Sequence, residues 1–270
     1  MKRNEIYKKI TDQIIAKLNA GTVPWEKSWV SGVPRNMVSG KSYRGINFLS
    51  LITHDFPSPQ YLTFTQCHKL GGTVSRNEKG SLIVFWKIVD RDAENDLNFR
   101  QVPLIKYSYV FNISQTSLYK ADVNESSFIT CEQLLSTLKN IPAVKHNYRR
   151  CYYDPVNDFV SVPVIRDFES GAEYYSSLWH ELIHSTGHPN KLNRFNIGDL
   201  QETAAYSEEE LVAELGSSFL SGMCGLSNKV INNQVAYIQG WLSKLGDDPN
   251  IIVRAAQKAK QAISYILTEE

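Results

Sequence analysis

Two histidines and a glutamate in the second half of the chain have the spacing of a metal-dependent hydrolase. They occur in the run His180-Glu181-Leu182-Ile183-His184. An α-helix turns once in about 3.6 residues, so His180 and His184 are predicted to share one face, where both imidazoles can bind one metal ion. Glu181 is predicted to be the general base that takes a proton from a metal-bound water, as in zinc peptidases. A chance match on a buried helix is a weak alternative, and a structural or inactive metal site is a stronger one.

The third metal ligand is predicted on a second helix. Apolar side chains recur at helical spacing between residues 211 and 219, and Glu210 and Glu214 share a face of that helix. Glu210 resembles the ligand glutamate of thermolysin-like gluzincins, and Glu214 then has the position from which an acid hydrogen-bonds a ligand histidine. Alternatively, Glu210 forms a capping box with Ser207, in which case Glu214 would be the metal ligand.

His188 offers a three-histidine alternative, which its position disfavours. The metzincin spacing requires the third histidine where this chain has Asn190. Gly187 is predicted to end the helix in a left-handed conformation, which would leave His188 off the helical face and in solvent.

The composition is that of a soluble globular protein. The 270 residues are 42% hydrophobic and 21% charged. No apolar run approaches the roughly 18 residues that span a bilayer, and the first residues do not read as a signal peptide, so a cytoplasmic protein with no membrane partner is expected. The four cysteines form no Cys-x-x-Cys pair, which argues against a disulfide framework and against a thiolate zinc site.

Charge divides the chain into two unlike halves. Residues 1–125 carry 17 Lys and Arg against 11 Asp and Glu, a balance of +6, whereas the remainder has a balance of −5. The asymmetry predicts two modules with different partners, and the basic one is suited to an anion such as nucleic acid.

The periodicity of the first half predicts an α+β module with an antiparallel sheet. A helix is expected over residues 4–20, and strands are expected at residues 61–64, 82–86 and 104–111. Thr65 is expected to cap a short helix between the first two strands. Residues 112–128 lose periodicity and are predicted to be a linker.

The second half is predicted to be mostly helical with a small antiparallel sheet. Thr130 and Ser170 each open a capping-box match at a helix start. The sheet is expected as a hairpin within residues 148–164, and a long helix is expected to close the chain at residues 247–266. The expected fold class is therefore α+β with two domains, residues 1–120 and 121–270.

One loop of the basic half mixes aromatic and cationic residues. Trp25 and Trp29 precede Lys41, Tyr43 and Arg44 in a segment rich in turn formers. Cations meet phosphates and aromatic faces stack on unpaired bases, so this mixture suits single-stranded nucleic acid. The two tryptophans are equally suited to filling the core of a small domain.

Over nearly its whole length, the chain resembles the ArdC antirestriction proteins of conjugative plasmids and related mobile elements. In the first half the likeness is carried by Pro24-Trp25, the run Lys41-Ser42-Tyr43-Arg44-Gly45-Ile46-Asn47, Gly71-Gly72, Lys79-Gly80, Phe85-Trp86, Tyr109-Val110-Phe111-Asn112 and Gln115-Thr116. In the second half it is carried by Tyr174-Tyr175, the nine residues from His180 to His188 and the run Glu209-Glu210-Leu211-Val212-Ala213-Glu214-Leu215.

The resemblance implies a single-stranded-DNA-binding domain, residues 1–120, fused to a zincin-like metallopeptidase domain, residues 121–270. It further implies protection of incoming plasmid DNA from host restriction in the recipient cytoplasm. The residues predicted to contact DNA are Trp25, Trp29, Lys41, Tyr43, Arg44 and Asn47.

Three hypotheses follow for the metal site. The protein is a metal-dependent peptidase tethered to DNA, a DNA-binding shield whose metal only stabilises the fold, or a regulatory peptidase that cuts one defined protein. Two imidazoles and a carboxylate suit Zn²⁺, and Mn²⁺ and iron tolerate similar ligands. The expected partners are single-stranded DNA and an unidentified protein or peptide substrate.

Overall fold

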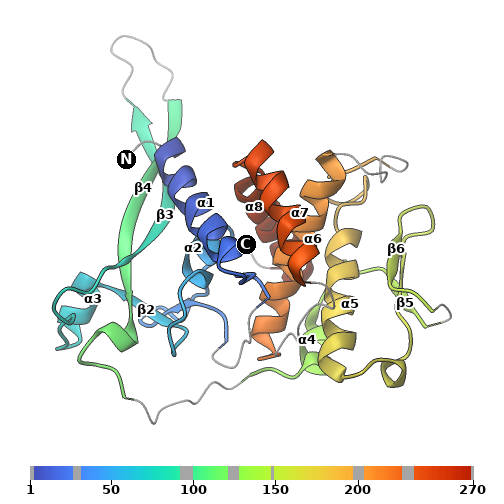
Figure 1. Ribbon diagram of the computed structural model, residues 1–270, viewed down its shortest axis with the longest axis horizontal. Helices are drawn as coiled ribbons and strands as arrows, with labels where there is room; N and C mark the ends of the chain where they lie inside the picture. Colours follow the sequence, from blue (N-terminus) through green and yellow to red (C-terminus); the bar gives the residue numbers. More distant parts are fainter. Residues whose placement is uncertain are drawn as a thin grey trace.

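Two sheets flank a central group of helices (Figure 1). The computed structural model describes residues 3–26, 32–91, 100–120, 128–146, 149–196, 204–226 and 234–268. Within these residues, no helix is both long and apolar enough to cross a membrane.

The first sheet has the strand order β1-β2-β4-β3. Its strands are β1 (Arg35–Asn36), β2 (Gln60–Thr63), β3 (Ser81–Arg91) and β4 (Arg100–Asn112). β3 and β4 form an antiparallel hairpin in which Ser81 pairs with Val110 and Arg91 with Arg100. This confirms the predicted antiparallel pairing, while the short β1 adds a parallel pair with β2. The sequence predicted an exposed loop or hairpin tip from Asp90 to Arg100, but Asp90, Arg91 and Arg100 lie in the paired strands. Residues 92–99 lie outside the described residues.

Three helices accompany this sheet: α1 (Arg3–Asn19), α2 (Ile46–Ile52) and α3 (Phe64–Lys69). The apolar stripe of α1 is buried as predicted. α2 lies along the open edge of β3, where the Ser50 hydroxyl donates to the Leu82 carbonyl over 2.7 Å. Such cover satisfies backbone groups that an edge strand would otherwise expose. α3 is capped by Thr63, not by Thr65, because the Thr63 side chain accepts from the Gln66 amide.

The start of the predicted linker is part of the first fold. Asn112 caps the short helix η1 (Ile113–Gln115) through a capping box with Gln115. Asn112, Gln115 and Thr116 are all buried. The linker prediction was therefore wrong for these residues, because local side-chain hydrogen bonds order them without any helical or strand periodicity.

The second half contains the predicted helices and hairpin, together with a strand, a short 3₁₀ helix and one long helix that the sequence did not predict. The helices are α4 (Cys131–Thr137), η2 (Ile165–Asp167), α5 (Gly171–Ser185), α6 (Ala204–Met223), α7 (Gln234–Asp247) and α8 (Ile251–Leu267), and the strands are β5 (Ala143–Lys145), β6 (Tyr152–Asp154) and β7 (Phe159–Ser161). Thr130 opens α4 with the predicted capping box. Ser170 caps α5, but the predicted box is incomplete because the Glu173 carboxylate accepts from the Glu169 amide. The β6–β7 pair is the predicted antiparallel hairpin, but β5 pairs with β7 in parallel, so the small sheet is mixed.

The two halves share one hydrophobic core. The Trp25 and Trp241 rings meet edge to face at 6.4 Å between centroids. Phe48 of α2 packs in the same way on Phe219 of α6 at 5.4 Å. The first half therefore rests directly on the helix that carries Glu210, and a domain boundary at residues 120 and 121 stays a prediction.

Candidate metal centre

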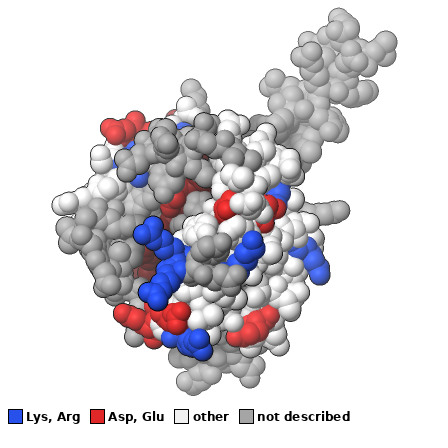
Figure 2. Space-filling view, turned by 90° about the vertical axis from the view of Figure 1, so that its right-hand side faces the viewer, with Lys and Arg blue, Asp and Glu red and all other residues white. Residues whose placement is uncertain are grey.

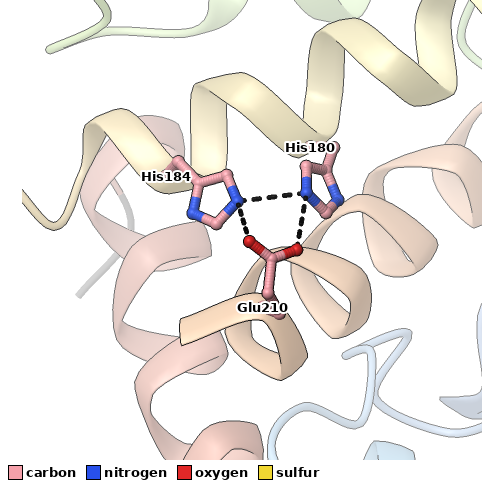
Figure 3. Close-up of side chains that lie close together, drawn as sticks. All are labelled: His180, His184 and Glu210. Carbon is pink, nitrogen blue, oxygen red and sulfur yellow. Dashed lines mark hydrogen bonds and ion pairs between the residues drawn. The ribbon is translucent and has the colours of Figure 1, made fainter. Parts of the chain in front are cut away.

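Helices α5 and α6 bring His180, His184 and Glu210 together (Figure 3). The two Nε2 atoms lie 3.0 Å apart. One Glu210 carboxylate oxygen lies 3.4 Å from His180 Nε2, and the other lies 3.4 Å from His184 Nε2. Two imidazole nitrogens and one carboxylate, from three residues on two helices, thus converge on one point.

The donor set fits a divalent cation. Ligands at about 2.1 Å from a tetrahedral ion lie about 3.4 Å from one another. The Nε2–Nε2 distance of 3.0 Å and the two Nε2–oxygen distances of 3.4 Å, each to a different Glu210 oxygen, are close to this value. Two imidazole nitrogens and a carboxylate are also the ligand types that zinc and manganese accept.

Close packing of α5 on α6 sets the distance between the ligands. Leu178, Leu182 and Ile183 of α5 are fully buried. Gly216 of α6 allows the close approach, because a Cβ there would lie 2.8 Å from Ile183 Cγ1. α6 begins before Ser207, so Glu210 does not occupy the third position of a capping box at its start.

The carboxylates around His184 favour a positive charge. Burial lowers the pKa of His184, but the hydrogen bonds to Glu209 and Glu210 outweigh burial and raise it to about 10. The pKa of Glu210 is held well below its usual range, since the two histidines outweigh the opposing effect of burial. Either a proton on the His184 ring or a divalent cation beside it would supply the positive charge that these carboxylates favour.

Glu209 makes a contact that the sequence did not predict. Its Oε1 lies 3.3 Å from His184 Nδ1, on the side of the ring away from Glu210. Arg194 binds the same carboxylate through two hydrogen bonds of 2.9 and 2.7 Å. A contact of Glu214 with a ligand histidine, which the sequence predicted, stays a prediction.

The segment after α5 differs from its prediction. α5 ends at Ser185, and Thr186 keeps right-handed backbone angles. Gly187 does not adopt the left-handed conformation. It is required for another reason, because a Cβ would meet the Phe195 ring and lie 3.0 Å from Arg194 Nη2. His188 is buried, contrary to the prediction of a solvated ring, and its Nδ1 accepts from the Asn190 amide over 3.1 Å.

The predicted general base has a polar neighbour near the small sheet. Glu181 is half-buried on α5, between the two ligand histidines in sequence. The Cys151 thiol, just before β6, interacts with Ser177 and Glu181, and burial raises its pKa. Cys151 therefore lies near the face of α5 that carries Ser177 and Glu181.

Charges of both signs occur on the side of the molecule that carries the small sheet. Figure 2 shows lysines, arginines and acidic residues interspersed among the coloured side chains there. The described part of this face therefore presents a mixed surface and not the single-sign field that steers charged ligands.

Comparisons with known proteins match both halves of the chain. Residues 4–111 match the family model described as the N-terminal domain of the anti-restriction factor ArdC, and residues 131–258 match that of a zincin-like metallopeptidase. Crystal structures of the antirestriction protein ArdC from plasmid R388 cover 96% of this chain. The metal-free structure has a TM-score of 0.77 and 32% identity over 95% of its own length, and the Mn(II)-bound structure has a TM-score of 0.75 and 31% identity over 96%.

The chain belongs to the ArdC antirestriction family.

Curated relatives extend the family to longer proteins. An Escherichia coli protein named DNA primase TraC is 29% identical over 99% of this chain, which spans 27% of that protein. An uncharacterized protein of Sinorhizobium fredii, y4eC, is 30% identical over 98% of this chain and 92% of its own length. The chain thus spans about a quarter of the TraC primase and nearly all of y4eC.

The ArdC-type first half buries one of the two tryptophans that were predicted to contact DNA. Trp25 is 1% exposed, and its carbonyl accepts from the Ser218 hydroxyl over 2.5 Å. Its ring cannot stack on a base from this position, so Trp25 is a core residue, which was the alternative. Trp29 lies outside the described residues.

Two more residues that were predicted to contact DNA, Arg44 and Asn47, instead make contacts within the protein. Arg44 lies with its guanidinium carbon 5.4 Å from the centre of the Phe219 ring, in the joint between the two halves. The Asn47 amide exchanges two hydrogen bonds of 2.7 Å with the backbone of Val84 on β3. These residues have structural roles that the sequence motif did not reveal.

Lys41 and Tyr43 lie closer to the surface. Lys41 is exposed, and Tyr43 is half-buried with its hydroxyl 3.2 Å from the Asn36 side-chain amide. Burial raises the pKa of Tyr43. Five of the six residues predicted to contact DNA lie among the described residues, and of these five Lys41 has the side chain that is most accessible to a phosphate.

Proposed function

We propose that this protein is an antirestriction factor that binds single-stranded DNA through its first half and cleaves a peptide bond at a divalent-metal site in its second half. The convergence of His180, His184 and Glu210 at donor separations of 3.0 to 3.4 Å supports the metal site. The family membership supports the antirestriction role, and the recipient cytoplasm is where such protection would act.

In the proposed peptidase reaction, His180, His184 and Glu210 would hold the cation. When bound, a Zn²⁺ or Mn²⁺ ion supplies polarisation of the scissile carbonyl and lowers the pKa of the attacking water. Glu181 would take the proton from that water and pass it to the leaving amine. β6 is the edge strand nearest α5 and suits an extended peptide, which could add to its free edge.

For DNA, the described surface that best suits unpaired bases lies on β4. Tyr107 and Tyr109 are two residues apart in the strand, expose 42% and 41% of their surface, and have ring centroids 6.3 Å apart. The Lys9 ammonium lies 5.8 Å from the centre of the Tyr109 ring. Exposed aromatic faces beside a cation bind bases and phosphates without sequence preference. We call Tyr107, Tyr109 and Lys9 the β4 tyrosine surface.

The replacement Glu181→Gln tests the peptidase proposal. It removes the general base and leaves the three metal-binding side chains in place, so metal content should stay stoichiometric while cleavage of casein or a cell proteome is lost. Antirestriction activity should fall with it in a plasmid-transfer assay into a restricting recipient. Full antirestriction activity of Glu181→Gln would instead favour a DNA shield with a structural metal.

Paired replacements test the DNA surface. Tyr107→Ala with Tyr109→Ala should weaken binding of single-stranded oligonucleotides by roughly 1–3 kcal/mol for each stacked base that is lost. Phe64→Ala is the matched control, since Phe64 is 53% exposed but lies on α3, outside the hairpin. Equal affinity of the double variant and wild type, measured across a salt series, would move the DNA site elsewhere.

A further inference from the structure

A buried ion pair joins the two helices of the metal centre. The side chains of Arg194 and Glu209 are 4% and 6% exposed. The guanidinium donates from Nε to Oε2 over 2.9 Å and from Nη2 to Oε1 over 2.7 Å. Two parallel charge-assisted bonds fix the orientation of both groups more strictly than a single contact would.

Arg194 also holds the end of α5. Its Nη1 donates to the Thr186 hydroxyl over 2.6 Å, and its Nη2 donates to the Ile183 carbonyl over 2.8 Å. Its own amide donates to the Gly187 carbonyl over 2.9 Å. One side chain therefore ties the last turn of α5, which carries His184, to the turn of α6 that carries Glu210.

The chain of contacts ends on a ligand ring. Glu209 Oε1 lies 3.3 Å from His184 Nδ1, while His184 Nε2 faces Glu210. A carboxylate on one imidazole nitrogen favours the proton on that nitrogen, which leaves a lone pair on the other nitrogen for a metal and limits rotation of the ring. A purely structural ion pair would not need to end on this atom.

We propose that Arg194 and Glu209 are positioning residues of the metal centre. They hold His184 with Nε2 turned toward the cation and keep α5 and α6 at the separation that the ligands require. This inference rests on the proposed metal site at His180, His184 and Glu210 but concerns residues that do not themselves touch the ion.

The test compares metal affinity in variants of the full chain. Glu209→Gln keeps the side-chain shape and one carbonyl acceptor but loses the bidentate pair. Titration calorimetry of the metal-free protein with Mn²⁺ or Zn²⁺ should give a dissociation constant about 10 to 100 times higher than that of wild type. Circular dichroism of the metal-free proteins should show that the variant is folded.

Glu208→Gln is the matched control. Glu208 is the preceding residue of α6, and it pairs instead with Arg254 and Lys258 of α8, each at 2.6 Å. This replacement also removes a carboxylate and its ion pairs from α6, but none of the described contacts of Glu208 reaches a ligand histidine. Its metal affinity should therefore stay within about twofold of wild type.

A second variant guards against misfolding. Glu209→Gln alone leaves the Arg194 charge buried without its partner, which can unfold a protein. Arg194→Met with Glu209→Gln removes both charges, so the fold should survive while metal affinity still falls. In the Zn²⁺-loaded proteins, nitrogen chemical shifts of His184 should report a proton on Nδ1 and the ion on Nε2 in wild type, and a mixture of arrangements in the double variant.

The outcomes separate the two proposals. Metal binding by wild type and Glu208→Gln, weakened in both Glu209 variants, supports the positioning role. Equal affinity in all four folded proteins overturns it while the proposed metal site stands. Failure of wild type itself to bind either ion overturns the proposed site, and the positioning role falls with it.

Discussion

The replacement Gly216→Ala tests whether close helix packing holds the metal ligands at their distance. A Cβ on Gly216 would lie 2.8, 2.9 and 3.0 Å from three carbons of Ile183. Carbon atoms prefer separations of about 3.5 Å or more, so Ile183 or the whole of α5 must move by roughly 0.5 to 1 Å. Ile183 directly precedes His184, so this movement displaces a ligand.

Two opposing effects set the expected size of the stability change. Overpacking of a buried contact costs about 1–3 kcal/mol. Alanine gains about 1 kcal/mol over glycine within a helix. Gly216→Ala should therefore lower the free energy of unfolding by up to about 2 kcal/mol, or about 2–4 °C in Tm for each kcal/mol. Its metal dissociation constant should also rise, because the displaced imidazole no longer meets the ion together with Glu210.

Gly240→Ala is the internal control. Gly240 lies within α7, and a Cβ there has no atom within 4 Å among the described residues. The free energy of unfolding of this variant should rise by about 1 kcal/mol, because alanine has the higher helix propensity, and its metal affinity should be unchanged. Scanning calorimetry should show a lower Tm for Gly216→Ala and a higher Tm for Gly240→Ala, and metal titration should show weaker binding in Gly216→Ala alone.

A third variant locates the clash. Ile183→Val removes one of the three crowded carbons, so Gly216→Ala should cost less in that background than in wild type. If Gly216→Ala and Gly240→Ala stabilise the protein equally, the close approach of α5 and α6 does not set the ligand geometry.

Three further outcomes are expected. Trp25→Ala should lower the free energy of unfolding in a denaturant titration by about 3–5 kcal/mol, because it empties a buried site against Trp241, and the folded fraction should bind DNA as wild type does. For Asp158, burial raises the pKa but hydrogen bonds, chiefly from Lys191 at 2.8 Å, lower it overall. Its contribution to stability is thus present above the unfolded-state pKa of about 3.9 and is lost as pH falls through the lower folded value, so the Tm deficit of Asp158→Asn at pH 7 should shrink below about pH 4. Mn²⁺ at 100 times its dissociation constant should stabilise the metal-free wild type by about 2.7 kcal/mol but leave Glu210→Ala unshifted, and an equal shift in both would place the ion elsewhere.

The sequence by itself determined the parts of this protein that depend on local periodicity. His180 and His184 lie four residues apart on α5, and the 3.6-residue helical repeat alone puts them on one face. The stripe of α1, the strand character of residues 82–86 and 104–111 and the caps of α4 and α5 follow from patterns within a few residues. Such features need no knowledge of what the element packs against.

Only the tertiary structure decided which distant side chains meet. Arg194 lies in a loop without periodicity, yet its guanidinium reaches Glu209, 15 residues away in sequence. Trp25 in its turn-rich segment is equally suited to a base or to a core until α6 and α7 close over it. The physical reason is that periodicity tells which face a residue occupies, whereas the partner of that face depends on how loops return the chain and how helices pack.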